Sequence, residues 1–353
     1  MPNWSESMQQ TFEYYVVDPG TWKDIKLLDN VTGCTIQRDS EVETRGSATI
    51  DVTESVGECY IRVYLVTIQN GLKERHPLGT FLVQTPSSNF DGKVRTVSMD
   101  AYTPLLELKE NPPPIGYYVA KDSNIMDTVS RLAKEHARAP VVETKTDDIL
   151  YYDFVADTDE TWLAYLSSLL ANAKYTFELD ELGRIIFAPK QDAAALQPVW
   201  TYDDDDESIL YSDVSMNHDI FDIPNVVEVI HSTGSEIHYA RIENEDPNSP
   251  TSTIARGRKI VRRITDPDLI GTEPTKTQVD AYAIRALEEL STVEYTVTYS
   301  HGYCPVRVGD CVRLNYARAG ITNVKAKVIS QSIKCEPGCP VQEKAVFTTK
   351  LWG

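Results

Sequence analysis

Apolar and polar side chains alternate along residues 11–104, in short runs rich in β-branched and aromatic residues. Such alternation is typical of strands that bury one face, and the glycines between the runs are typical of turns. The runs are Cys34–Asp39, Ala48–Thr53, Tyr60–Val66 and Thr80–Gln84, and the hairpin-type dipeptides are Asn70-Gly71 and Asp91-Gly92. We therefore predict an antiparallel β-barrel or sandwich over 1–104.

A helical periodicity replaces this alternation after the proline-rich connector 111–114. Ser123 is a candidate cap for one helix, and Asp157 or Thr158 is a candidate cap for a second. In the first helix the apolar positions at helical spacing are Ile125, Val129, Leu132 and Ala133. In the second they are Trp162, Leu163, Leu166, Leu169 and Leu170. A hairpin about Asp180–Gly183 follows, so the pattern predicts a compact α+β domain over 105–200.

Strand patterns return after residue 201 and are interrupted by one further helix. The strand-like runs are Asn225–His231, Glu236–Ile242 and Lys259–Ile264. Thr275 and Gln278 form a capping-box pair at the start of the helix. We predict a second β-barrel domain from 201–237 and 293–353, with a strand-and-helix subdomain inserted at 238–292. The predicted fold class is mainly β with α+β insertions.

Composition and charge narrow the possible functions. The 353 residues are 41% hydrophobic, which is ordinary for a globular protein of several domains. No apolar run approaches the ~18–20 residues of a membrane span, and the N-terminus lacks the features of a signal peptide. The net charge of -19 repels phosphate backbones and anionic lipid, so we expect no tight nucleic-acid binding. An acidic wall still suits a channel through which DNA passes.

Common catalytic motifs are absent from the sequence, including His-Glu-x-x-His, Gly-x-Ser-x-Gly and the Walker loop. His231 and His238 lie on consecutive predicted strands and are candidate neighbours, although such pairs are more often packed or solvent-facing than ligands. The acidic run 203–207 offers oxygens for Ca²⁺, but consecutive side chains cannot all point at one ion. A solvated acidic loop is the favoured interpretation of that run.

Four of the six cysteines fall near the C-terminus, at Cys304, Cys311, Cys335 and Cys339. A hairpin about Ala319-Gly320 with partner numbers summing to 639 would place Cys311 opposite Val328. The same ladder would place Cys304 opposite Cys335, with Cys339 across a tight turn. Cys311 joins these thiols if the segment 305–310 folds back as a loop.

Three states of these thiols stay open on the sequence alone. They are reduced structural cysteines, ligands of Zn²⁺ or an iron–sulfur cluster, or a disulfide pairing Cys335 with either Cys339 or Cys304. Cys34 and Cys59 are interpreted as separate core thiols.

Several longer segments carry a diffuse signature. They are Trp200–Val214, Ile223–Val229, Ala240–Ser252, Gly302–Arg313 and Lys334–Val341. These segments resemble the tail-hub (baseplate hub) proteins of tailed phages and phage-derived contractile injection systems, and the resemblance covers essentially the whole chain. It implies that the two predicted barrels are tail-tube-like, and that the protein is structural and not an enzyme.

The resemblance also implies an assembly. Family hubs are homotrimeric rings whose six similar barrels meet a six-fold tail tube on one side and a three-fold spike or tip on the other. The implied partners are further copies of the chain and the tail tube, distal tail or baseplate, spike or tip, and tape-measure proteins. The implied location is the virion tail, assembled in the host cytoplasm, where thiols stay reduced.

Two other functions remain as alternatives. A tail-associated cell-wall hydrolase, acting as a peptidase or glycosidase, would use two of the many carboxylates. A host-surface binding module would use some of the 19 tyrosines, although strands favour aromatic residues in any case.

Overall fold

The computed structural model describes residues 2–90, 92, 95–191, 195–205, 208–232, 236–267 and 275–353. Two compact units divide the chain. The large unit comprises Met1–Val214 and Thr298–Ala345, and the small unit comprises Ser215–Val297 and Val346–Gly353. Strands make up 47% of the structure and helices 15%, which confirms the prediction of a mainly β chain.

The first β part of the large unit is a run of antiparallel strands. They are β1 (Gln9–Asp18), β2 (Lys23–Leu28), β3 (Val31–Asp39), β4 (Gly46–Val52), β5 (Tyr60–Gln69), β6 (Leu72–Phe90) and β7 (Arg95–Tyr102). Alternate residues face an apolar core that includes Ile36, Ile50, Val63 and Met99. The Asn70-Gly71 turn between β5 and β6 has positive φ at both residues, as its sequence predicts. In the other predicted turn, Asp91 lies outside the described residues.

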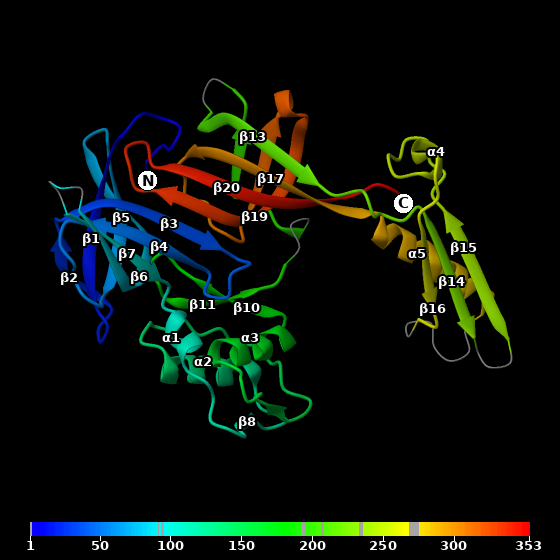
Figure 1. Cartoon of the computed structure of the whole chain (residues 1–353), viewed down its shortest axis with the longest axis horizontal. Helices are drawn as coiled ribbons and strands as arrows, with labels where there is room; N and C mark the ends of the chain where they lie inside the picture. The colour runs from blue at the N-terminus through cyan, green and yellow to red at the C-terminus, as the bar shows by residue number, and fades with distance from the viewer. Residues whose placement is uncertain are drawn as a thin grey trace. The chain divides into compact units, whose positions relative to one another are not determined.

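The α+β part follows in the large unit. Its elements are α1 (Leu106–Glu110), β8 (Tyr118–Val119), α2 (Ile125–His136), β9 (Phe154–Val155), α3 (Trp162–Asn172), β10 (Tyr175–Leu179) and β11 (Ile185–Pro189). The helices begin later than predicted, because Asn124 and Thr161 provide the capping side chains in place of Ser123 and Asp157 or Thr158. Figure 1 shows the β10–β11 hairpin between these helices and the large sheet. The helices share one apolar core with Val17 of β1 and Tyr60 of β5.

The second β part is assembled from two distant stretches of chain. Its strands are β12 (Trp200–Asp203), β13 (Leu210–His218), β17 (Thr292–Gly302), β18 (Cys311–Tyr316), β19 (Ile321–Lys334) and β20 (Pro340–Lys350), with η3 (Ala317–Ala319) between β18 and β19. The division between the units passes through β13, β17 and β20.

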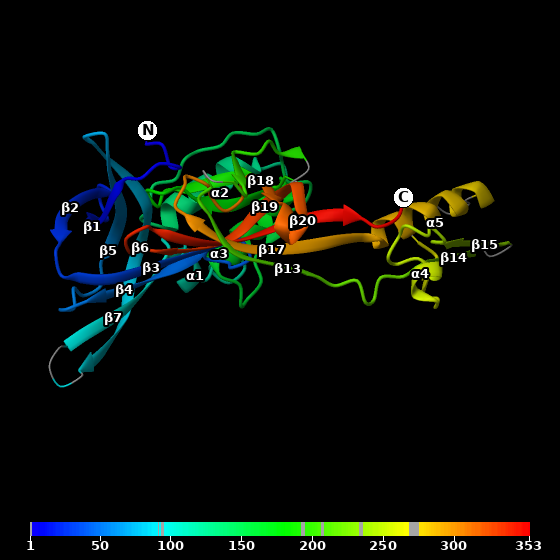
Figure 2. The same ribbon diagram turned by 90° about the horizontal axis from the view of Figure 1, so that it is seen from above.

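One strand pair joins the first and second β parts. Strand β19 runs antiparallel to β3, with Ile333 opposite Ile36, and the two strands lie side by side in both ribbon views (Figures 1 and 2). The result is a 13-stranded sheet with the order β13-β17-β20-β19-β3-β4-β7-β6-β5-β1-β2, from which β18 and β12 branch off at β19. We expected two closed barrels; among the described strands, no pairing closes either part into a ring.

The small unit holds a three-stranded sheet covered by a helix. Its elements are β14 (Val226–Ser232), β15 (Ile237–Glu243), α4 (Thr253–Arg256), β16 (Val261–Thr265) and α5 (Lys276–Leu290). The predicted capping box of Thr275 and Gln278 is present at the start of α5. Val279, Ala283 and Leu287 of α5 pack on Val227 and Val229 of β14.

Strand β14 lies elsewhere than expected. The sequence pattern groups it with the second β-barrel over 201–237, but it pairs with β15 on one side and β16 on the other. The structural reason is its burial, since four consecutive residues from Val226 to Val229 are buried. Such a strand needs the central position of a covered sheet. The insertion therefore begins near residue 215, earlier than the predicted 238.

No helix of the described chain has both the length and the apolar character needed to cross a bilayer.

Candidate functional site

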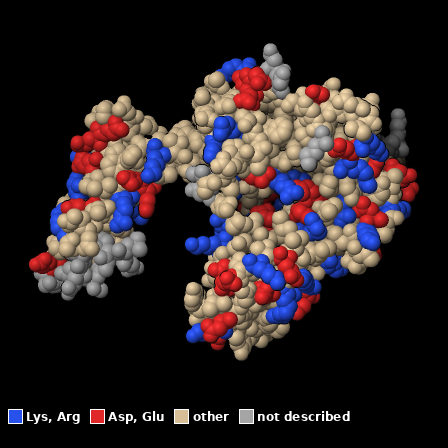
Figure 3. Space-filling view, turned by 180° about the vertical axis from the view of Figure 1, so that it is seen from behind, with Lys and Arg blue, Asp and Glu red and all other residues tan. Residues whose placement is uncertain are grey.

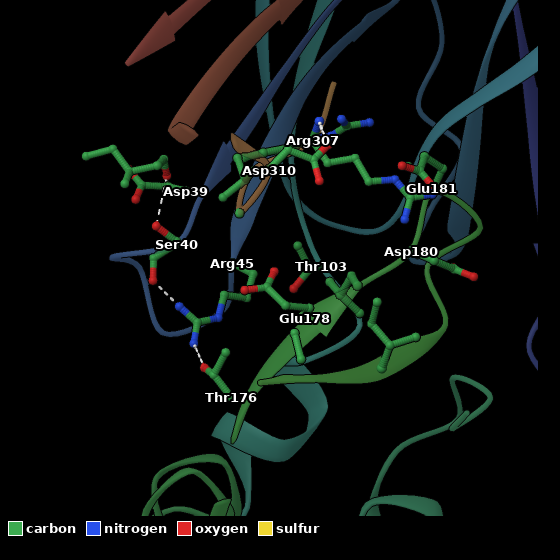
Figure 4. Close-up of a pocket in the computed structure, with 18 of the residues that line it drawn as sticks. Asp39, Ser40, Arg45, Thr103, Thr176, Glu178, Asp180, Glu181, Arg307 and Asp310 are labelled. Carbon is green, nitrogen blue, oxygen red and sulfur yellow. Dashed lines mark hydrogen bonds and ion pairs between the residues drawn. The ribbon is translucent and has the colours of Figure 1, made fainter. Parts of the chain in front are cut away.

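A cavity of about 630 Å³ opens in the large unit where its three parts meet. The first β part contributes the turn between β3 and β4, the α+β part contributes β10 and β11, and the second β part contributes the loop before β18. Figure 4 shows Glu178 beside Arg45, with Asp310 and Arg307 on another wall. No local sequence pattern predicts this site, because the β3–β4 turn, the β10–β11 hairpin and the loop before β18 are more than 100 residues apart in the chain.

Arg45 fixes one wall of the cavity. The residue has a left-handed backbone, with φ of 61°, at the end of the β3–β4 turn. Its guanidinium donates from Nε to the carbonyl of Phe177 at 2.9 Å and from Nη2 to Oγ1 of Thr176 at 2.5 Å. A third donation, from Nη1, goes to the carbonyl of Ser40. One side chain thereby ties the β3–β4 turn to β10.

Two carboxyl groups that line the cavity, those of Glu178 and Asp310, have raised pKa values. Burial raises the pKa of Glu178, although the positive charges of Arg45 and Lys327 oppose that shift. Burial also raises the pKa of Asp310, whose Oδ2 accepts a hydrogen bond from the backbone N–H of Arg307 at 2.8 Å. Both carboxyls are therefore biased toward the neutral form. A glycosidase instead needs one carboxyl group whose pKa is raised and a second carboxyl group that stays ionised.

Two basic side chains of the lining have polar partners within it. The Arg307 guanidinium forms an ion pair with Glu181, and Lys327 donates to the carbonyl of Gln191 at 3.1 Å. Neither histidine nor cysteine occurs among the described lining residues. Basic and acidic side chains are likewise interspersed over the face of the molecule drawn in Figure 3. The cavity thus offers polar contacts but no nucleophile activated by a base.

A second polar cluster is buried inside the second β part. Glu343 is 0% exposed and its Oε2 accepts from the Tyr299 hydroxyl at 2.6 Å, while its Oε1 accepts from Gln331 Nε2 at 2.5 Å. His301 is 1% exposed, and its Nε2 lies 3.4 Å from Glu343 Oε1 and 3.1 Å from the Tyr202 hydroxyl. This arrangement is a hydrogen-bonded ion pair without contact to solvent.

Cys304 lies beside that ion pair, so the cluster has the residue types of a cysteine nucleophile with a base and a carboxylate. Its Sγ is 4.0 Å from His301 Nδ1, and His301 Nδ1 is only 2.6 Å from the carbonyl of Gly302. Burial lowers the pKa of His301, but hydrogen bonds with Cys304 and Glu343 raise it further, so the imidazole holds its proton. A buried, protonated imidazole cannot act as a base toward a substrate. The cluster is therefore a structural core element.

The other cysteines lie in different surroundings. In the β18–β19 hairpin Cys311 pairs with Lys327 and not with Val328, because Tyr316 already pairs with Ile321 across the turn and the irregularity between Leu314 and Tyr316 shifts the register back by only one residue. Strand β19 then pairs with β3, so Cys335 bonds to the backbone of Cys34 and does not face Cys304. The predicted register is therefore wrong, and the residue that faces Cys335 is Cys34.

All six cysteines are free thiols. Within the described ranges, no three histidine, cysteine, aspartate or glutamate side chains are grouped so that they could hold a metal ion. A zinc or iron–sulfur site at Cys304, Cys311, Cys335 and Cys339 has no geometric support and stays a prediction from the sequence.

The remaining candidate residues have ordinary partners. His231 and His238 are directly opposite each other on β14 and β15, as expected. In the acidic run, Asp203 accepts a hydrogen bond from Asn315 at 2.7 Å and Asp204 pairs with Arg318. Asp206 and Glu207 lie outside the described residues.

Comparison with known proteins gives fold relatives only. Neither a protein-family model nor a curated protein sequence matches the chain. A tail protein from Neisseria meningitidis MC58 superimposes with a TM-score of 0.60 at 12% identity, covering 97% of this chain and 98% of that one. The 43 kDa tail protein of prophage MuSo2 from Shewanella oneidensis gives 0.60 at 10% identity, covering 96% and 98%.

The chain has the fold of phage tail proteins. A chain of the Francisella PdpA–VgrG complex shares it, with a TM-score of 0.53 at 8% identity. The superposition covers 98% of this chain but only 53%, about half, of the chain from the Francisella complex. The resemblance to tail proteins that the sequence indicates is confirmed at the level of the fold, and such relatives are compatible with a structural role.

Proposed function

We propose that this protein is a tail or baseplate hub of a phage or of a phage-derived injection particle. Three copies form a ring that adapts a six-fold tail tube to a three-fold spike or tip and lets DNA or tape-measure protein pass. The observation that carries the proposal is the similarity to tail proteins over nearly the full length of both chains.

The sheet of the large unit supports a ring with alternating parts. Because β3 and β19 join two β parts in each chain, three chains related by a three-fold axis present six β parts. A symmetry adaptor needs that geometry. The α+β part, 105–200, and the inserted subdomain would then decorate the outside of the ring.

The ends of the sheet supply surfaces for assembly. Among the described strands, β2 and β13 are at opposite ends of the strand order. A head-to-tail ring needs two different surfaces on each subunit, and unpaired strand edges are templates for pairing with another chain. On β2 the side chains of Ile25 and Leu27 are 64% and 50% exposed and, two residues apart, share one face.

The proposed partners are further copies of the chain and the tail tube, distal tail or baseplate, spike or tip, and tape-measure proteins, within the virion tail. The net charge of -19 suits the wall of a conduit for polyanions. An inner wall that proved basic would contradict this part of the proposal.

The mass of the assembly tests the proposal. We expect analytical ultracentrifugation to find a species with three times the 39.7 kDa chain mass, and tails that carry the chain to contain three copies. A double variant, Ile25→Lys with Leu27→Lys, should lower the trimer fraction at least tenfold. Ile115→Lys, at a residue 92% exposed in the α+β part, should leave it unchanged. Assembled tails with any copy number other than three would overturn the proposal.

A further inference from the structure

Cys34 and Cys335 lie at facing positions of the strand pair that joins the two β parts. The register pairs Ile36 with Ile333 and Thr35 with Lys334, and the next pair in this ladder is Cys34 with Cys335. The backbone N–H of Cys335 donates to the carbonyl of Cys34 at 2.9 Å. Facing residues of an antiparallel ladder have Cα atoms ~4.5 or ~5.5 Å apart, and a disulfide spans ~4.4–6.8 Å. The Cα separation expected for this pair therefore lies within the range that a disulfide spans.

The side chains of this pair are in contact. Cys335 packs against the apolar cluster that contains Cys34 and Tyr14, and its proximity raises the pKa of the Cys34 thiol. Cys34 is buried in the core of the first β part, whereas Cys335 is half-buried at its margin. Reagents in solution therefore reach Cys335 first.

Cys339 is the competing partner across the turn after Cys335. It is buried, its backbone N–H donates to the carbonyl of Glu336 at 2.8 Å, and its φ is 41°. In the described part of the chain, no hydrogen bond joins its thiol to that of Cys335. Burial raises the pKa of Cys339 and the nearby Cys335 raises it further, so it is the ladder register and the backbone hydrogen bond that favour Cys34 as the partner of Cys335.

We infer that Cys34 and Cys335 are a site of oxidative modification, at which a small-molecule disulfide such as oxidised glutathione converts two thiols into a bond between the two β parts. This bond differs from both disulfides considered from the sequence, and the inference does not depend on the proposed function.

The reaction proceeds by two thiol–disulfide exchanges. The thiolate of Cys335 attacks one sulfur of the small disulfide, giving a mixed disulfide on Cys335 and releasing one small thiol. The sulfur of Cys34 then attacks the Cys335 sulfur, forming the protein disulfide and releasing the second small thiol. Two protein thiols are oxidised and one small disulfide is reduced to two thiols. Cys335 is the first nucleophile because it is the more exposed of the two thiols, whereas Cys34 is buried and its interaction with Cys335 and its burial raise its pKa.

Such a bond would fasten the β3–β19 junction covalently. The two residues are about 300 positions apart in the chain, so the bond closes a very long loop. Cross-links that close long loops restrict the unfolded chain most. We expect the oxidised protein to unfold at a higher temperature than the reduced protein.

The test is incubation of the folded protein with oxidised glutathione, followed by alkylation, a non-reducing denaturing gel and peptide mapping. We expect the free thiols to fall from six to four, a peptide pair linked through Cys34 and Cys335, and a faster gel band, because the long loop makes the denatured chain compact. A bond between Cys335 and Cys339 closes a tiny loop and would leave the band in place.

Four variants separate the outcomes. Cys34→Ser and Cys335→Ser should each abolish the fast band, whereas Cys339→Ser and Cys59→Ser should keep it. A fast band in Cys34→Ser, mapping of Cys335 to Cys339 in the wild-type protein, or six thiols remaining after oxidation would each overturn the inference. The wild-type peptide map decides by itself if a serine variant fails to fold.

Discussion

The first β part is folded from consecutive strands of residues 9–102, whereas the second takes its strands from two stretches that the small unit separates. Their cores differ as well. The first part buries apolar side chains such as Ile50 and Met99, and its buried Arg62 pairs with a partly exposed Asp24. In the second part both members of the pair His301 and Glu343 are buried. Apolar packing accommodates small changes in shape, but a buried ion pair is stable only with every partner in place. Joined in one sheet, the two parts should therefore respond very differently to substitution.

Breaking the ion pair should have the largest effect. Glu343→Gln leaves the charge of His301 buried without its partner, so we expect a loss of about 3–5 kcal/mol in the free energy of unfolding. Urea unfolding followed by near-ultraviolet circular dichroism measures it. The matched control is Glu41→Gln, at an exposed pair with Lys344, which should cost less than ~1 kcal/mol. Equal losses in the two variants would show that the buried pair is not special.

The pH dependence of stability should identify the same pair. Burial lowers the pKa of His301, but hydrogen bonds with Cys304 and Glu343 raise it to about 10. The contribution of His301 to the free energy of unfolding is therefore complete below its unfolded pKa of about 6.5 and is lost as the pH rises toward 10.

The stability that Glu343 contributes depends on pH in the opposite direction. Burial raises its pKa, but the hydrogen bond and charge of His301 lower it further, so its contribution is complete above its unfolded pKa of about 4.3 and is lost on further acidification. Unfolding in urea from pH 4 to pH 10 should therefore give greatest stability near pH 5–6 for the wild-type protein relative to Glu343→Gln. A constant difference between the two proteins across that range would contradict the ion pair.

A conservative change in the first core should have the smallest effect. Ile50 is fully buried, and Ile50→Val removes one methylene, so we expect a loss of about 0.5–1.5 kcal/mol in the same urea experiment. A loss as large as that of Glu343→Gln would erase the proposed difference between the cores.

Local chemistry made much of the fold predictable. The turn at Asn70-Gly71, the β10–β11 hairpin and the capping box of Thr275 and Gln278 each depend on neighbouring residues, and each is found where the pattern predicts. Helix starts were displaced because the side chains of Asn124 and Thr161 accept the capping hydrogen bonds in place of the residues that the pattern suggests.

The pairing of strands that are far apart in the chain could not be predicted from the local pattern of apolar and polar residues. The β3–β19 pair brings Cys34 to Cys335, and a sequence analysis that treated Cys34 as an isolated core thiol could not place it there. The assignment of β14 to the small unit and the cavity beside Arg45 depend on the same kind of distant contact. The predicted hairpin register failed at the turn, where Tyr316 pairs with Ile321, and the partner of Cys311 changed with it.

The central claim is that the two β parts of three chains alternate around one ring. A cryo-electron microscopy reconstruction of the tail tip that carries this protein tests it most directly. The account predicts three copies, with β1–β7 and the strands β12, β13 and β17–β20 in alternation at one radius. Any other number of copies, or the two parts at different radii, would contradict it.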